Sequence, residues 1–246
     1  MASVLDLKVQ CYLAVYSGVI STLSPSLTTI QLLKTFNRSV STRELAGISL
    51  RIFPHQCLLK WAQMNAATPV KERANPWVAF GVVGVLQGGV YGQCTTYVSK
   101  LLGLAKEPPR LQDLLRGSAF AGTRDTISQG VPFAYSATVQ RTVVDPVYAS
   151  LLGPVDEEDA SQPVRRMVAV MACSIGATVA SQFPHNCQIC MQADPALGYA
   201  GVVQKLTSEF GPRALYMGAS ARIALLLVVN GLNELVLKKA WAKEEA

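Results

Sequence analysis

The sequence predicts an all-α membrane protein with six transmembrane helices, arranged as three repeats of a helix pair. Half of the 246 residues are apolar and only 15% are charged, whereas soluble domains contain about 25% charged residues. The charges leave three long uncharged stretches, and each is followed by an apolar segment that an arginine interrupts. This composition excludes a disordered chain and argues against an ordinary soluble enzyme.

The uncharged stretches cover residues 9–33, 74–99 and 167–193. Each is longer than the roughly 20 residues that a helix needs to cross a bilayer. None has the positively charged start, short apolar core and small-residue cleavage site of a signal peptide. We therefore expect one membrane helix in each stretch.

The interrupted apolar segments cover about 45–64, 117–140 and 214–237, and contain Arg51, Arg124 and Arg222 respectively. An ionised side chain within a membrane helix costs about 3 kcal/mol on insertion scales and usually faces the interior of a helix bundle. The same order occurs three times, which indicates an internal repeat. We predict a single domain over residues 1–246, with repeats at about 7–70, 74–145 and 164–242.

Two local patterns predict further packing. The segment 194–213 is long enough for a helix of its own, with Val202, Val203 and Leu206 on one face. Small residues let membrane helices approach closely, and glycines crowd one stretch of the third helix and recur in two others. These glycines are Gly81, Gly84, Gly88, Gly89 and Gly92, together with Gly18 and Gly176.

Motifs in all three repeats resemble the mitochondrial carrier family. Residues 198–209 and 211–218 resemble its matrix helix, its acidic–glycine element and the aromatic-x-Gly start of an even-numbered helix. Residues 51–58 resemble the second helix of adenine nucleotide carriers. Residues 115–117, 124–125 and 133–135 resemble the family's fourth helix. The resemblance implies a six-helix carrier fold in the mitochondrial inner membrane, with both termini on the intermembrane-space side.

The chain departs from the family at the charged positions that close a carrier. The family closes its matrix side with a Pro-x-acid-x-x-base motif on each odd-numbered helix, where proline kinks the helix and the charges pair between repeats. The acid positions here hold Leu27, Gln93 and Asn186, and the base positions hold Ile30, Thr96 and Ile189. Of the acids expected on the even-numbered helices, Glu234 is the one present. Alternating access needs two states, each held by its own contacts, so these losses predict a chain that no longer transports.

The resemblance also implies a substrate site at Arg51, Arg124 and Arg222, on or near the family's contact points. Guanidinium groups bind carboxylate and phosphate through two parallel hydrogen bonds, so a working site would favour an anion. The alternative is that each arginine pairs with helix-end carbonyls, with lipid phosphate or, for Arg124, with its neighbour Asp125.

A second set of candidates consists of glycines at the starts of helices, where the resemblance implies bound cardiolipin. Free N–H groups and the helix dipole bind phosphate at such ends. The alternative is that these glycines only permit tight turns. The candidates are Gly47, Gly117, Gly201 and Gly218.

The remaining motifs argue against catalysis. No catalytic triad, carboxylate pair or phosphate-binding loop is present in the sequence. Cys187 and Cys190 lie near His185, but no second pair of ligands completes a zinc site. We therefore predict no catalytic residues, no metal and no cofactor other than bound cardiolipin. Basic residues are scattered, which argues against nucleic acid. The acidic run 156–159 is interpreted as a solvated loop or, alternatively, as a docking surface.

The leading interpretation is a carrier-fold inner-membrane protein that serves as a non-transporting structural or accessory subunit. It would contact membrane lipids and the other subunits of a respiratory-chain complex or ATP synthase. The alternative is a divergent carrier for an anionic metabolite or nucleotide. A third class is a carrier-derived protein that acts on other proteins, in insertion or as a receptor.

Overall fold

The computed structural model describes residues 116–154, 161–194 and 196–220 continuously, together with 222–224, 226–228 and short stretches within 11–19, 41–62 and 77–85. These residues form helices and turns and contain no strand, so the all-α prediction is confirmed. The predicted helices at 9–33 and 74–99 lie mostly outside the described residues. The acidic run 156–159, Glu234 and the gate positions of the first two repeats lie wholly outside them.

The first Arg-bearing segment is helical wherever it is described between 42 and 62. Its start is fixed by a reciprocal pair of bonds, because Ser41 N–H donates to Glu44 Oε2 at 2.9 Å and Glu44 N–H donates to Ser41 Oγ at 3.2 Å. This arrangement is a capping box, which satisfies N–H groups that the first turn leaves free. The bonds from the Ser41 backbone and hydroxyl hold the pKa of Glu44 below its usual range.

The second Arg-bearing segment forms one unbroken helical run that extends beyond the predicted end at 140. It comprises α5 (Ser118–Asp125), the π-helix η1 (Thr126–Gly130), α6 (Val131–Val139), the π-helix η2 (Gln140–Val144) and α7 (Asp145–Leu152). Each π-helix ends two residues before a proline, Pro132 or Pro146. A proline ring clashes with the carbonyl four residues earlier, and the wider π turn relieves that clash. The prolines thus distort the helix without ending it.

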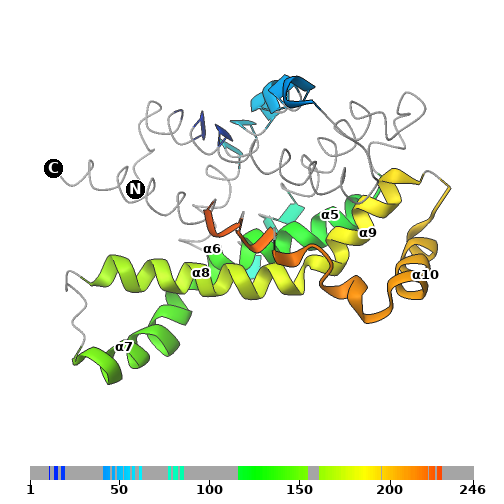
Figure 1. The fold of residues 1–246 in the computed structure, drawn as a ribbon. Helices are drawn as coiled ribbons and strands as arrows, with labels where there is room; N and C mark the ends of the chain where they lie inside the picture. Colours follow the sequence, from blue (N-terminus) through cyan, green and yellow to red (C-terminus); the bar gives the residue numbers. More distant parts are fainter. Residues whose placement is uncertain are drawn as a thin grey trace.

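The predicted helix at 167–193 is divided into α8 (Gln162–Ala180) and α9 (Gln182–Ala193). The division falls at Ser181, three residues before Pro184, whose ring would meet the carbonyl of Ala180 in a regular helix. The two helices run antiparallel to the second-repeat segment, with α8 against α6 and α9 against α5 (Figure 1).

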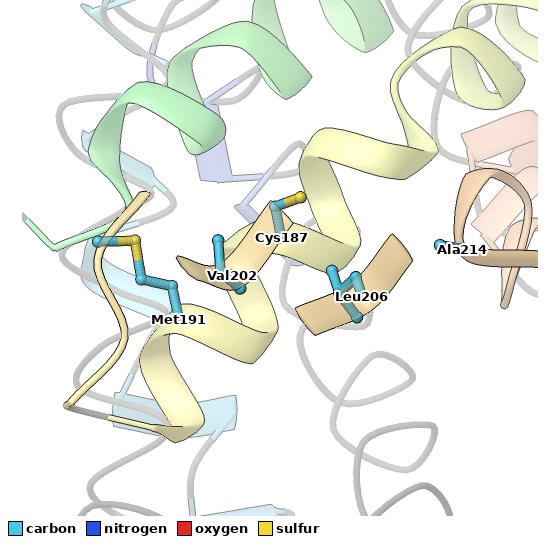
Figure 2. Packing of buried hydrophobic residues seen from close by; sticks show 5 residues of the cluster. All are labelled: Cys187, Met191, Val202, Leu206 and Ala214. Carbon is cyan, nitrogen blue, oxygen red and sulfur yellow. The ribbon is translucent and has the colours of Figure 1, made fainter. Parts of the chain in front are cut away.

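The predicted additional helix is confirmed as α10 (Tyr199–Phe210), which is followed by the 3₁₀ helix η3 (Gly211–Leu215). Both pack on α9 around a buried apolar cluster (Figure 2), with Phe120 and Phe183 at its border. The cluster consists of Cys187, Met191, Val202, Leu206 and Ala214. After a turn at 216–218, helical residues resume at Ala219. The last Arg-bearing helix therefore begins later than the predicted 214, because η3 and the turn intervene.

Two glycines allow the two helices of a predicted pair to approach each other closely, one in the first repeat and one in the second. A Cβ atom on Gly84 would overlap the Thr126 side chain, and one on Gly18 would meet Cys57 Sγ. The close-packing prediction is confirmed at these two positions. Among the described atoms, none lies within 4 Å of a Cβ built on Gly81 or Gly176, so no close approach is found there.

Candidate functional site

The exposed face of the helix α8 is apolar, whereas its buried face mixes small apolar residues such as Ala169 and Ala177 with polar ones. Its exposed face holds Val164, Val168, Ile175 and Val179, which are 42–61% exposed. Its buried face holds Arg165, Ser174 and Thr178, each 1% exposed or less. Within the described part of the chain, α8 is the one helix long and apolar enough to cross a membrane. Length and apolarity also occur in the core helices of soluble proteins, so the apolar exposed face and the buried Arg165 are the more informative features.

A buried polar cluster joins α9 to its neighbours; it consists of Arg124, Asp125, Gln182, His185, Asn186, Gln188 and Arg222. The Arg124 guanidinium binds both carboxylate oxygens of Asp125, and its Nε lies 2.6 Å from Oδ1. Its Nη1 donates to Gln188 Oε1 at 2.8 Å and lies 3.4 Å from His185 Nδ1. Arg124 and Asp125 are 3% and 4% exposed, so this ion pair lies inside the helix packing.

The other end of the polar cluster fixes the turn after η3. Asn186 Nδ2 donates to the carbonyls of Ala214 and Met217, at 3.0 and 3.1 Å. Gln182 Nε2 donates to the same Met217 carbonyl at 2.8 Å, and its Oε1 accepts from Arg222 Nη1 at 3.3 Å. Backbone carbonyls near the ends of helices need a hydrogen-bond partner when they are removed from water. The two amides provide it.

The structure brings together two of the three predicted arginines. Arg124 and Arg222 both lie against α9, where Arg124 contacts His185 and Gln188 and Arg222 donates to Gln182. Arg51 lies instead on an exposed part of its helix. The alternative interpretation of Arg124, an ion pair with its neighbour Asp125, matches the observed geometry.

Sequence reasoning singled out His185 and Asn186 for other roles and missed Gln182 and Gln188. A signal was present, because these four polar residues lie one to three positions apart in an otherwise apolar stretch, and Gln182, His185 and Asn186 have the spacing i, i+3, i+4. Such spacing gathers side chains on one side of a helix. The spacing did not reveal which helices would face them.

The candidate lipid-binding glycines lie in three kinds of position. Gly117 caps α5 with φ of +72° and is buried against Gln188, while Gly218 precedes the last helix with φ of +81°. Both conformations favour glycine over any other residue. Gly201 lies inside the first turn of α10, after its cap Gly198, and Gly47 is half-buried within its helix. Near Gly117, the Ala119 N–H donates to the Tyr199 hydroxyl at 3.4 Å.

Two further arginines fix the ends of the α8–α9 unit. Arg165 donates to Asp145 Oδ1 at 2.7 Å and to Ser161 Oγ at 3.1 Å, which ties the start of α8 to α7. Arg116 donates to the carbonyls of Met191 and Leu197, at 3.0 and 2.6 Å, and so caps the last turn of α9.

The cysteines near His185 belong to the packing. Cys187 is fully buried in the apolar cluster, and Cys190 borders it. Among the residues that the structure describes, no three metal-ligating side chains come together. No family model, curated protein or solved structure matches this chain.

Proposed function

We propose that this protein is a carrier-type, three-repeat protein of the mitochondrial inner membrane that no longer transports. It serves as a structural subunit of a larger membrane assembly, such as a respiratory-chain complex or ATP synthase. The observation that carries the proposal is the buried polar cluster, in which the arginines suited to a substrate bind the protein's own side chains.

The membrane location rests on the polarity of α8. In water, exposing Val164, Val168 and Ile175 while burying Arg165 would forfeit hydrophobic stabilisation and desolvate a charge. In a bilayer the same arrangement is favourable, because lipid covers the apolar face and the charge faces the bundle interior.

The loss of transport rests on the state of the two buried arginines. A substrate-binding arginine must be reachable from a water-filled cavity. Arg124 and Arg222 are only 3% and 8% exposed, and the Asp125 carboxylate already holds Arg124 through two contacts. An incoming anion would have to displace this carboxylate before it could bind Arg124.

The role within an assembly is supported by α7, which has no buried residue and displays a row of apolar side chains near its tie to α8. Val147, Leu151 and Leu152 of α7, together with Val143 near the end of η2, are 52–75% exposed. Such a row suits contact with membrane lipids or with the helices of other subunits.

The test is blue-native electrophoresis of gently solubilised mitochondria, with this chain followed by mass spectrometry. We expect the chain to migrate quantitatively with a large complex and to be released only by harsher detergent. Migration as a small free species under the gentlest conditions would overturn the structural-subunit proposal.

A second candidate is a divergent carrier for an anionic metabolite or nucleotide. It is favoured by the convergence of Arg124 and Arg222 on one helix, α9. A transported solute must stabilise the native state by binding it, by about 2.7 kcal/mol at 100 times its Kd. A carrier would therefore melt at higher temperature with phosphate, a nucleotide or a carboxylate, and Arg124→Ala would abolish the shift. A structural subunit is indifferent to all three.

A further inference from the structure

We infer that α7 is a docking helix, whose exposed apolar side chains insert into an apolar groove on a neighbouring subunit, with lysine or arginine at the rim of that groove. Val147, Leu151 and Leu152 form its docking face. The inference rests on the proposed role as a subunit of a larger assembly, and it names the surface of contact and the chemistry of the partner.

The docking face gains almost nothing from contacts within the chain. Val147, Leu151 and Leu152 are 52%, 75% and 72% exposed, and no residue of α7 is buried. Val147 and Leu151 are four positions apart, so they lie on one side of the helix, and Leu152 widens the apolar surface. Short helices depend on tertiary packing for their stability. A partner would supply the packing that α7 lacks.

The start of α7 lies at the level where the uncharged part of α8 ends. Asp145, the first residue of α7, accepts a hydrogen bond from Arg165 at 2.7 Å, and the uncharged stretch of α8 begins only at 167. Because α6 is antiparallel to α8, the chain leaves the uncharged region as it passes from α6 into α7, and α7 then diverges from α8 (Figure 1). Arginines at the ends of membrane helices reach the headgroup level. The docking face is therefore at or beyond the headgroups, where acyl chains do not cover it.

α7 also lacks the polar face of a helix that lies flat on a membrane. Such interfacial helices carry lysine and arginine opposite their apolar side, and α7 contains neither. Its one carboxylate, on Asp145, is bound to Arg165, and its Ser150 hydroxyl donates to the Val147 carbonyl of the same helix at 2.8 Å. Lipid headgroups would find no polar face to contact, whereas an apolar groove on a protein needs none.

The charges that follow α7 in the sequence define the rim of the groove. The acidic run 156–159 begins four residues after Leu152. A chain spans at most about 3.6 Å per residue, so the first of these acids lies within about 14 Å of the end of α7, whatever path the chain takes. Anionic headgroups repel such a run, whereas lysine or arginine on a protein attracts it. The partner is therefore a protein with basic residues beside its apolar groove.

The base of α7 is fixed by contacts that leave the docking face exposed. Arg165 binds Asp145, and its guanidinium carbon lies 5.7 Å from the centre of the Tyr148 ring. Gly153, with φ of +104°, ends the helix directly after Leu152. A helix that is already ordered pays less for association than a segment that must fold on binding.

The first experiment identifies what covers the docking face. A photoreactive residue is introduced by Leu151→p-benzoylphenylalanine, and the chain is irradiated in intact inner membranes. We expect an adduct with one other subunit, at a peptide that carries lysine or arginine beside apolar residues. The same probe at Val179, on the exposed face of α8, should react with lipid. An adduct of the Leu151 probe with lipid, or with many proteins alike, would overturn the inference.

The second experiment places a charge on the docking face. Leu151→Asp should lower the ratio of assembled to free chain about tenfold in blue-native gels, because an anchor of the contact is lost. Leu215→Asp is the matched control, since Leu215 is an exposed leucine of η3, and it should assemble normally. The unfolding temperature of purified Leu151→Asp should equal that of the wild-type protein. Normal assembly of Leu151→Asp would overturn the inference, and so would a lower unfolding temperature, which would show that Leu151 packs within its own chain.

The basic rim is tested separately. The double variant Glu157→Gln with Glu158→Gln keeps the size of both side chains and removes two charges. We expect a smaller loss of assembly, about threefold, at low salt and none at high salt, because salt screens attraction between exposed charges. Equal assembly of this variant and the wild-type protein at low salt would refute the basic rim.

Failure of the proposed function has a different signature. A wild-type chain that migrates as a free species, while its Leu151 probe still joins one protein in intact membranes, would refute the large assembly and leave the docking helix intact. A chain that migrates with a large complex, while the probe joins only lipid, would refute the docking helix and leave the structural subunit intact.

Discussion

The helices α8 and α9 share the uncharged stretch 167–193, with Arg165 and Arg166 preceding it near the start of α8, yet the two helices are built differently. Along α8 the large apolar side chains Val168, Ile175 and Val179 face outward, and the buried face holds mostly small residues, both apolar, such as Ala169, and polar, such as Ser174. Along α9, residues 185–188 are all buried, and three of the four are polar. The exposed face of α8 matches a lipid surrounding, whereas α9 matches the side chains and carbonyls of neighbouring segments. The break at Ser181 separates α8, with its apolar exposed face, from α9, with its buried polar residues.

The sharpest test of the α9 side is removal of the carboxylate that neutralises Arg124. Asp125→Ala leaves a buried, uncompensated guanidinium, and breaking a buried ion pair in this way costs about 3–5 kcal/mol. We expect a large loss in the thermal unfolding temperature of the purified protein. The double variant Arg124→Leu with Asp125→Leu removes both charges and should recover much of the loss. Equal stability of Asp125→Ala and the wild-type protein would show that Arg124 is not held in this pair.

The matching test of the α8 side places a charge on its exposed face. Ile175→Lys should cost about 3 kcal/mol if this face meets the centre of a bilayer. The measurement is the membrane-inserted fraction after translation in the presence of membranes. Val164→Lys, near the end of the helix, should cost less because lysine can extend to the interface. If Ile175→Lys yields a stable soluble protein, α8 does not face lipid.

A smaller loss of stability is expected at Gly84, which lies outside α8 and α9 and packs against Thr126 of the second-repeat segment. Gly84→Val forces a side chain into Thr126, and overpacking of this kind costs about 1–3 kcal/mol. Gly81→Val is the matched control, since a Cβ there meets none of the described atoms within 4 Å. The thermal unfolding temperatures of the wild-type protein and Gly81→Val should be similar, and both should be higher than that of Gly84→Val. The reverse ranking would contradict the close crossing.

The smallest effect is expected at the exposed capping box, far from both α8 and α9. The pKa of Glu44 is lowered by Ser41, so the contribution of its carboxylate to stability is present above the unfolded value of 4.5. It is lost as the pH falls through the folded value. Hydrogen exchange of residues 42–50 should therefore accelerate at low pH beyond the intrinsic change. Ser41→Ala should give faster exchange at neutral pH and remove this pH dependence, while exchange within α8 stays unchanged.

Several of these features were predictable because they depend on residues close together in the chain. The helical segments and the apolar face of α10 follow from local periodicity. The sequence also suggested the neighbouring pair of Arg124 and Asp125. The division of 167–193 into two helices was not predicted, because its uncharged length resembles one continuous span.

The polar cluster could not be predicted in the same way. The bond from Arg124 to Gln188 joins residues 64 positions apart, and that from Arg222 to Gln182 joins residues 40 positions apart. Periodicity shows that a helix has a polar face, but it does not show which helix will meet that face. The exposure of Arg51 could not be predicted either, because the sequence does not show which side of its helix faces a neighbouring helix.

The sequence by itself determined that this protein is helical and that its charges are fewer than in an ordinary soluble protein. Composition and residue spacing act locally, so their effects can be predicted from the sequence without knowledge of the folded structure. The tertiary structure alone decided that Arg124 and Arg222 lie buried against α9 and that Asn186 binds the carbonyls of Ala214 in η3 and of Met217 in the turn after it. Those choices follow from the need to give every buried polar group a partner, and the partners become neighbours only when the chain is folded.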